Sequence, residues 1–158
     1  MRHGSTRAGS ARTSTRQSNR TSIAIVSEAE RGLLDTSVVI DHDLVDPSRL
    51  PAESAISAVT LAELAAGPHA TDDDEERARR QDRLQWAAST WDPLPFDAAA
   101  ARVYGRVFAA ARAPGRSHRP RLADLQIASV AAANGLPLYT RNPADFAGLE
   151  GIVTVQTV

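Results

Sequence analysis

Short apolar runs alternate with segments of helical periodicity, and this alternation constrains the fold more than any other feature. The runs cover residues 33–35, 55–59, 136–140 and 152–155, with a weaker candidate at 94–96. A strand–helix alternation is typical of a parallel sheet with helices on both faces. We therefore expect a three-layer α/β sandwich around a central parallel sheet of about 4–5 strands.

Capping residues mark the ends of the expected helices. Thr36 or Ser37 is expected to cap a first helix, and Thr60 a second that ends near Gly67. A polar helix should begin at about residue 72, and Asp97 should cap the next. The last long helix is expected from Pro120 to about residue 134, followed by a glycine C-cap signal.

Charge is unevenly distributed along the 158 residues. Residues 1–20 hold five arginines and no acid, whereas the remainder has thirteen basic residues against nineteen acids. We expect residues 1–22 to be a disordered Arg/Ser-rich tail and residues 23–158 to form one domain. The tail resembles an organellar transit peptide in composition, but a misplaced start codon or a dispensable tail explains it as well. No run approaches the roughly 20 apolar residues of a membrane span, and no secretory signal is present, so we expect a cytoplasmic protein.

Two residue types are missing from the sequence. The absence of cysteine excludes disulfides, thiolate metal sites and a cysteine nucleophile. The absence of lysine excludes a P-loop lysine, a Schiff-base lysine and a kinase lysine. The motif G-x-S-x-G of serine hydrolases does not occur either.

Four carboxylates lie at comparable chain positions next to apolar residues: Asp35, Glu63, Asp124 and Asp145. Asp35 follows a predicted strand, Asp145 follows another after a short turn, and Glu63 and Asp124 lie near predicted helix starts. In open parallel sheets all of these positions border the carboxyl ends of the strands. Gathered acids repel one another unless a cation lies between them, so we expect an Mg²⁺ or Mn²⁺ site there. Such an ion would suit hydrolysis of a phosphodiester.

Each acid also has a purely structural explanation. Asp35 could be a turn residue, Glu63 a solvated helix position, Asp124 a first-turn acid favoured by the helix dipole, and Asp145 a cap. The same holds for three supporting candidates. Asn142 is a potential neutral ligand or a turn former, and Thr36 and Ser37 could hold Asp35 or cap a helix.

A cluster of arginines precedes the helix of Asp124. Its members are Arg112, Arg116, Arg119 and Arg121. They are candidates for binding RNA phosphates close to the metal, and a solvated loop is the alternative.

The sequences LDTS (residues 34–37), TLAEL (60–64), ADLQIA (123–128) and TRNPADF (140–146) together resemble the PIN domain. Within that family they are most similar to the VapC-type toxins of type II toxin–antitoxin systems, over about residues 33–155. The resemblance implies a magnesium- or manganese-dependent endoribonuclease with a parallel sheet, an RNA substrate, a homodimer and a cognate VapB-like antitoxin.

The resemblance assigns metal-binding and catalytic roles to Asp35, Glu63 and Asp124. The family often has an aspartate where this chain has Asn142, and Asp145 is the candidate to replace it. Whether one or two metals bind stays open. A catalytically degenerate PIN domain that only binds RNA or protein is the alternative. Haloacid-dehalogenase phosphatases require a second aspartate where this chain has Ser37, and replication-type nucleases are longer.

Overall fold

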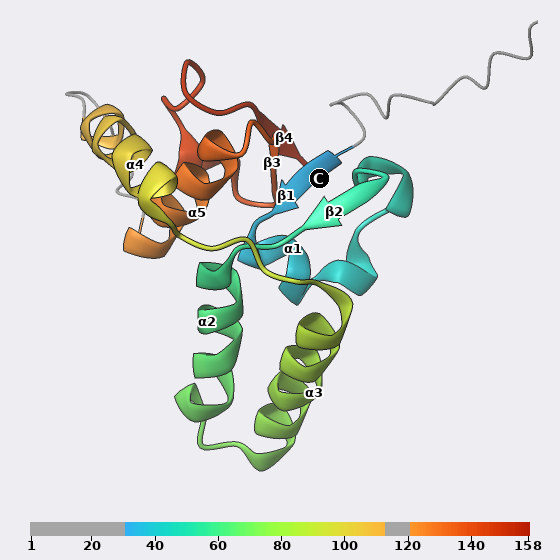
Figure 1. The fold of residues 1–158 in the computed structure, drawn as a ribbon. Coiled ribbons are helices and arrows are strands. Elements are labelled where there is room, and N and C mark those ends of the chain that lie inside the picture. Colours follow the sequence, from blue (N-terminus) through green and yellow to red (C-terminus); the bar gives the residue numbers. More distant parts are fainter. Residues whose placement is uncertain (1–30, 113–120) are drawn as a thin grey trace, which may run out of the picture.

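A parallel sheet lies at the centre of the protein, with β1 (Arg31–Leu34) paired to both β2 (Glu53–Ala55) and β3 (Leu138–Thr140), and with β4 (Val155–Thr157) beyond β3 (Figure 1). The structure is a computed structural model that describes residues 31–112 and 121–158. Within these residues the sheet has four strands in the order β2-β1-β3-β4. The expected tail, residues 1–22, and the expected start of the domain lie outside the described residues.

The sheet is connected and covered by five α-helices and several 3₁₀ turns in the described part of the chain. The α-helices are α1 (Thr36–Ile40), α2 (Ala58–Ala66), α3 (Asp74–Thr90), α4 (Ala98–Ala111) and α5 (Leu122–Ala133). The 3₁₀ turns are η2 (His42–Leu44), η3 (Pro47–Arg49), η4 (Gly67–Ala70) and η5 (Pro143–Phe146). None of these helices is both long and apolar enough to cross a membrane.

Successive side chains of a strand point to opposite faces, and this divides the core in two. Leu33 and Leu138 are fully buried in a cluster built mainly from α4 and α5. Leu34 and Tyr139 belong to a second cluster on the other face, with residues of α1, α2 and α3. Figure 1 shows α4 and α5 side by side, while α2 and α3 extend from the sheet as an antiparallel pair. The expected three-layer α/β sandwich is confirmed.

Gly32 allows β1 and β3 to pack as they do. A Cβ atom at this position would lie 2.3 Å from Cε2 of Tyr139 and 3.0 Å from Cγ of Pro51. The aromatic ring therefore covers the glycine backbone directly, and any side chain there would displace it.

The expected C-cap of α5 is present. Gly135 adopts φ 65°, in the left-handed region that favours glycine. Its N–H donates to the carbonyl of Ala132, and the N–H of Leu136 donates to the carbonyl of Ala131 at 3.0 Å. These two bonds form a Schellman motif, which ends the helix and directs the chain into β3.

Several predicted boundaries were wrong. Ser57, and not Thr60, caps α2: its buried Oγ accepts the N–H of Thr60 at 3.0 Å. The preceding strand is Glu53–Ala55 and not residues 55–59, because the chain turns into the helix earlier. The candidate strand at 94–96 is a single parallel bridge between Leu94 and Ser57, and the last strand begins at Val155.

The expected caps at Asp97 and before α1 had different outcomes. The Asp97 side chain accepts the N–H of Ala100 at 2.9 Å, as predicted. The N-cap of α1 is Asp35, and neither Thr36 nor Ser37 performs that role. Both hydroxyls are used elsewhere.

Candidate active site

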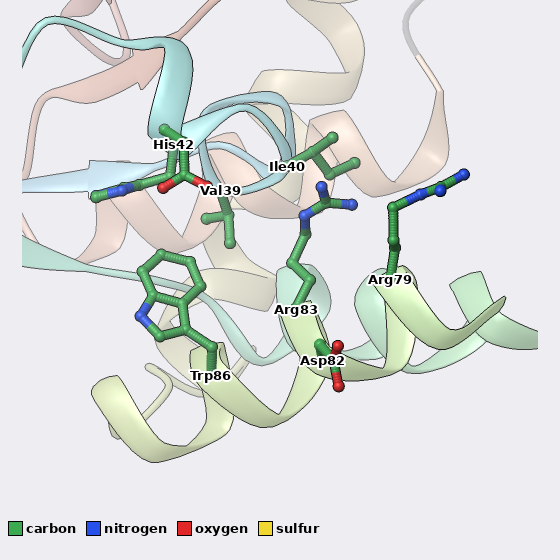
Figure 2. A pocket seen from close by; sticks show the side chains of 8 residues that line it. Val39, Ile40, His42, Arg79, Asp82, Arg83 and Trp86 are labelled. Atoms are coloured by element: carbon green, nitrogen blue, oxygen red, sulfur yellow. The ribbon is translucent and has the colours of Figure 1, made fainter. Parts of the chain in front are cut away.

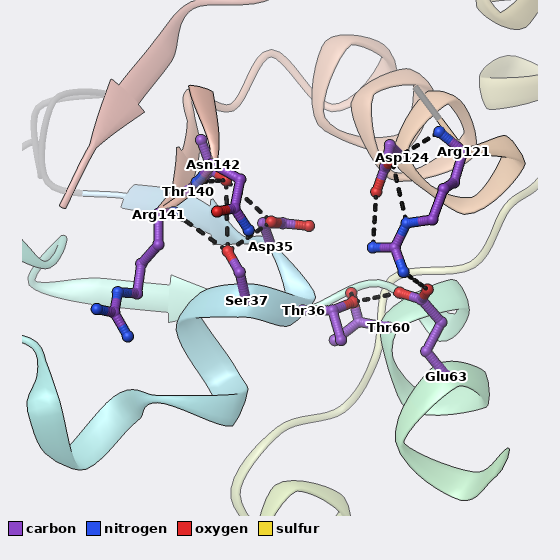
Figure 3. Close-up of polar contacts among 10 residues, drawn as sticks. All are labelled: Asp35, Thr36, Ser37, Thr60, Glu63, Arg121, Asp124, Thr140, Arg141 and Asn142. Carbon is purple, nitrogen blue, oxygen red and sulfur yellow. Dashed lines mark hydrogen bonds and ion pairs between the residues drawn. The ribbon is translucent and has the colours of Figure 1, made fainter. Parts of the chain in front are cut away.

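Asp35 is held at the carboxyl end of β1, in a buried position. Its backbone N–H donates to the carbonyl of Tyr139 at 2.9 Å, and its side chain is directed across the end of the sheet (Figure 3). Oδ2 accepts two hydroxyls, Ser37 Oγ at 2.7 Å and Thr140 Oγ1 at 2.9 Å. This oxygen is therefore fixed by residues of α1 and β3, and only 4% of Asp35 is exposed.

The other carboxylate oxygen of Asp35 has no such support. Among the described residues, Oδ1 is buried without a hydrogen-bond partner. An unsatisfied buried oxygen is costly, and a native protein that retains one usually has a functional reason such as a bound ion. One anchored oxygen and one bare oxygen is the arrangement of a carboxylate prepared to ligate a cation through a single atom.

Glu63 lies on α2 and is held by the residue after Asp35. Thr36 Oγ1 donates to Glu63 Oε2 at 2.5 Å, and it lies 3.4 Å from Thr60 Oγ1. The Glu63 side chain is 24% exposed. The carboxylate of Glu63 is therefore only partly solvated, because the buried Thr36 hydroxyl at the start of α1 holds it.

Asp124 lies in the first turn of α5 and is almost fully buried, with 1% exposed. Its Oδ2 accepts the backbone N–H of Arg121 at 2.8 Å. Burial raises the pKa of Asp124 above its usual value, while the hydrogen bonds and charge of Arg121 oppose that rise. A first-turn acid that served only the helix dipole would be solvated, so its burial indicates a further role.

Asp145 and Asn142, the two candidates for the fourth position of the expected set, lie on different sides of the cluster. Asp145, in η5, is near enough to Asp124 that its negative charge contributes to the raised pKa of Asp124. Asn142 is exposed, and its backbone N–H donates to Thr140 Oγ1 at 3.0 Å. In Figure 3 Asn142 lies beside Asp35 and Ser37, away from the pair formed by Glu63 and Asp124.

A guanidinium bridges two of the acids. Arg121 Nη2 is 3.3 Å from Asp124 Oδ1, and its Nη1 is 3.9 Å from Glu63 Oε1. Three chain-distant segments therefore meet: the end of β1, the middle of α2 and the first turn of α5. Within residues 31–112 and 121–158, however, no three histidine or acidic side chains stand at metal-binding spacing. The expected ligands are gathered but not closed around one point.

The arginine candidates separate in the structure. Arg112 places its guanidinium over the Phe108 ring, 5.4 Å from the ring centroid, as a cation–π contact. Arg121 lies in the acidic cluster, whereas Arg116 and Arg119 lie outside the described residues.

Two threonines take part in the cluster without having been proposed for it. Thr140 is fully buried and donates to Asp35, and Thr60 is fully buried beside Thr36. A hydroxyl in the last position of an apolar strand, where a valine or leucine would be usual, is the signal that could have identified Thr140.

A separate hollow of about 310 Å³ lies between α1 and α3 (Figure 2). It is lined by Ile40, His42, Arg83 and Trp86, among others, and by neither Asp35 nor Asp124. The His42 ring packs 4.9 Å from the Trp86 ring, centroid to centroid. A smaller hollow of about 260 Å³ shares Ile40 and Arg83 and reaches Glu63. An uneven, partly apolar surface therefore lies next to the acids.

Comparison with known proteins places this geometry in context. The family described as PIN domain matches residues 32–150. Ribonuclease VapC5 of Mycobacterium tuberculosis is 38% identical over 130 residues, which are 80% of this chain and 93% of that protein.

Solved structures agree in fold. The VapBC-5 toxin–antitoxin complex of Mycobacterium tuberculosis contains a chain that matches with a TM-score of 0.70 and 38% identity, covering 82% of this chain and 98% of that one. FitAcB of Neisseria gonorrhoeae matches with a TM-score of 0.61 and 26% identity, covering 78% and 95%.

Proposed function

The chain belongs to the PIN-domain family, and on that premise we propose that it is the toxin of a type II toxin–antitoxin pair, an endoribonuclease neutralised by a cognate VapB-like antitoxin. The observation that carries the proposal is Asp35, whose buried carboxylate has one oxygen anchored and the other bare. Glu63 and Asp124 converge on its rim of the sheet from two other elements.

We propose Mg²⁺ or Mn²⁺ as the cofactor, held by Asp35, Glu63 and Asp124, with Asp145 and Asn142 at the fourth position. The donor set is oxygen-only, which suits hard divalent cations. When bound, such an ion would activate water for attack and neutralise charge on the RNA phosphodiester.

The protein's own residues would position these ligands. Ser37 and Thr140 fix Oδ2 of Asp35, so that Oδ1 faces the site. Thr36 fixes Glu63 in the same way. Hydroxyls that orient ligating carboxylates commonly affect metal affinity or activity by about 10- to 100-fold.

The test is cleavage of a structured RNA by the purified protein with Mg²⁺ or Mn²⁺. EDTA and the variant Asp35→Asn should each abolish cleavage. Cleavage that survives both controls would overturn the metal mechanism. A protein that neither cleaves RNA nor binds metal in calorimetry would instead be a degenerate PIN domain that acts as a binding module.

We propose that the antitoxin binds beside the acids, over the hollows between α1, α2 and α3. Ile40 is 41% exposed there and Trp86 37%, both large apolar side chains. Ile40→Asp should therefore weaken the complex with the product of the neighbouring antitoxin gene, measured by co-purification. An unchanged complex would place the antitoxin elsewhere.

A homodimer in the cytoplasm completes the proposal. Phe108 on α4 and Leu122 on α5 are 42% and 62% exposed, and helix faces that carry such side chains are suited to contact a second copy. Sedimentation of the wild type and of Leu122→Asp tests this, and a wild-type monomer would contradict it.

A further inference from the structure

Arg121 occupies an unusual position for an arginine proposed to bind RNA. Its guanidinium donates from Nε to Asp124 Oδ2 at 3.4 Å and from Nη2 to Asp124 Oδ1 at 3.3 Å. It also approaches Glu63, which lies on a different helix, at 3.9 Å. The dashed contacts in Figure 3 show one cation shared by two carboxylates of the candidate metal site.

The side-chain contacts of Arg121 are long and solvent-exposed. Its side chain is 70% exposed, whereas the Asp124 side chain is 2% exposed. The contact to Glu63 is longer than a hydrogen bond, and both bonds to Asp124 are longer than a usual charge-assisted bond. The guanidinium can therefore leave the two acids and be hydrated by solvent with little rearrangement, while Asp124 and Glu63 remain in place.

The backbone of Arg121 has a different task from its side chain. Its N–H donates to Asp124 at 2.8 Å, and this bond satisfies a free donor at the start of α5. Any residue other than proline at position 121 would keep that bond. The side chain can thus leave or be replaced without removing the cap.

We propose that Arg121 is a displaceable internal cation, which bridges Asp124 and Glu63 when no divalent ion is bound and competes with that ion for the two carboxylates. This inference rests on the proposed metal-dependent function. Nearby carboxylates repel one another without a cation between them, and the guanidinium supplies one positive charge where the ion would supply two. The bridging arginine also explains why the expected ligands lie near one another without metal-binding spacing among the described residues, because it holds Asp124 and Glu63 apart.

The measurement is the affinity of the full-length protein for Mn²⁺ alone, by calorimetry, for the wild type and Arg121→Gln. Removal of the competing cation should tighten Mn²⁺ binding roughly 10-fold. In Arg121→Gln the ion no longer has to break the ion pairs of Arg121, and the guanidinium no longer repels it. Arg121→Lys, which keeps the charge but loses the planar guanidinium, should fall between the two.

Arg141→Gln is the matched control. Arg141 lies near Ser37 through its backbone, but its guanidinium pairs with Asp41 and not with Glu63 or Asp124. The same charge is removed at the edge of the site, and Mn²⁺ affinity should change less than about 2-fold. A similar gain in both variants would reduce the effect to general electrostatics and overturn the inference.

Thermal unfolding in EDTA and in Mn²⁺ gives a second readout that does not depend on activity. Arg121→Gln should have a lower Tm in EDTA, because two acids lose their counter-ion, and a larger rise in Tm on addition of Mn²⁺. Equal or weaker Mn²⁺ binding by Arg121→Gln would show that Arg121 supports the site and does not compete for it. If neither protein binds Mn²⁺, the proposed metal site fails, and this inference fails with it.

Discussion

Two carboxylate–arginine clusters in this protein behave in opposite ways. On α3, Glu76 accepts Arg80 Nε at 2.7 Å and Arg79 Nη2 at 2.8 Å, and these bonds lower its pKa. In the candidate site Asp124 is also paired with an arginine, yet its pKa is raised. The Glu76 side chain is 31% exposed and that of Asp124 2%. The comparison shows that burial, and not the presence of an arginine partner, decides whether the pKa of the carboxylate is raised or lowered.

The two clusters also differ in their effect on the stability of the fold. The α3 pairs are formed within one helix, at spacings of three and four residues, and contribute little to stability. Asp124 is desolvated by tertiary packing, at a cost that its arginine only partly offsets. A protein that retains such a group commonly does so for function, which agrees with the proposed site.

The largest difference should appear in activity. Asp124→Asn should reduce RNA cleavage more than about 100-fold, since loss of a metal ligand exceeds the effect of losing a residue that orients one. Glu76→Gln should leave cleavage unchanged. Initial rates with Mg²⁺ measure both, and comparable losses in the two variants would remove the functional distinction between the clusters.

A smaller loss is expected from the hydroxyl that fixes Glu63. Thr36→Val keeps the shape of the side chain but removes the donor to Glu63, so cleavage should fall about 10-fold. Thr90→Val is the control, because the hydroxyl of Thr90 donates within α3, to the carbonyl of Trp86, and not to a carboxylate. Wild-type rates for Thr36→Val would show that Glu63 needs no such support.

Stability should change in the opposite direction to activity. The pKa of Asp124 is raised on folding, so the folded protein binds this proton more readily than the unfolded chain, and the group destabilises the fold as pH rises above its usual range near 3.8. Asp124→Asn, which still accepts the Arg121 N–H, should raise Tm by a few degrees at pH 7 in EDTA. The gain should shrink as the pH is lowered towards 4. A lower Tm at pH 7 would indicate that the pairing with Arg121 outweighs burial.

The smallest effect is expected on α3. The lowered pKa of Glu76 means that its contribution is present above its usual value of 4.5 and is lost as pH falls. Because its pairs are local and only partly buried, Glu76→Gln should change Tm at pH 7 by no more than about 2 °C. A drop of more than about 5 °C would show that the α3 pairs hold the α2–α3 pair of helices together.

The sequence predicted the elements better than their boundaries. Strand–helix alternation gave the parallel α/β sandwich, and Asn134 and Gly135 marked the end of α5 correctly. The cap of α2 was misplaced because Ser57 and Thr60 are both good capping residues, and only the turn after β2 selects between them. Pairing partners also decide strand ends, which is why residues 94–96 form only a bridge.

The acids were identifiable from sequence because each lies next to apolar residues at a comparable position in a strand–helix unit. Their chemical environments were not. Local sequence cannot reveal that Asp35 Oδ1 is buried without a partner, or that Thr140, brought in by β3, fixes Oδ2. These properties depend on contacts between segments far apart in the chain.

The sequence by itself determined the α/β class, which follows from periodicity, and the carboxylates to be tested, which follow from residue type and position. It also determined the family, through its resemblance to the motifs of the PIN domain. Only the tertiary structure decided the burial and the hydrogen-bond partners of each charged group. The sequence shows Arg121 only as one member of a basic cluster, and the fold places its guanidinium between Asp124 and Glu63. The physical reason is that hydrogen bonding and desolvation are set by three-dimensional neighbours, and the neighbours of this site come from β1, α2, α5 and β3 together.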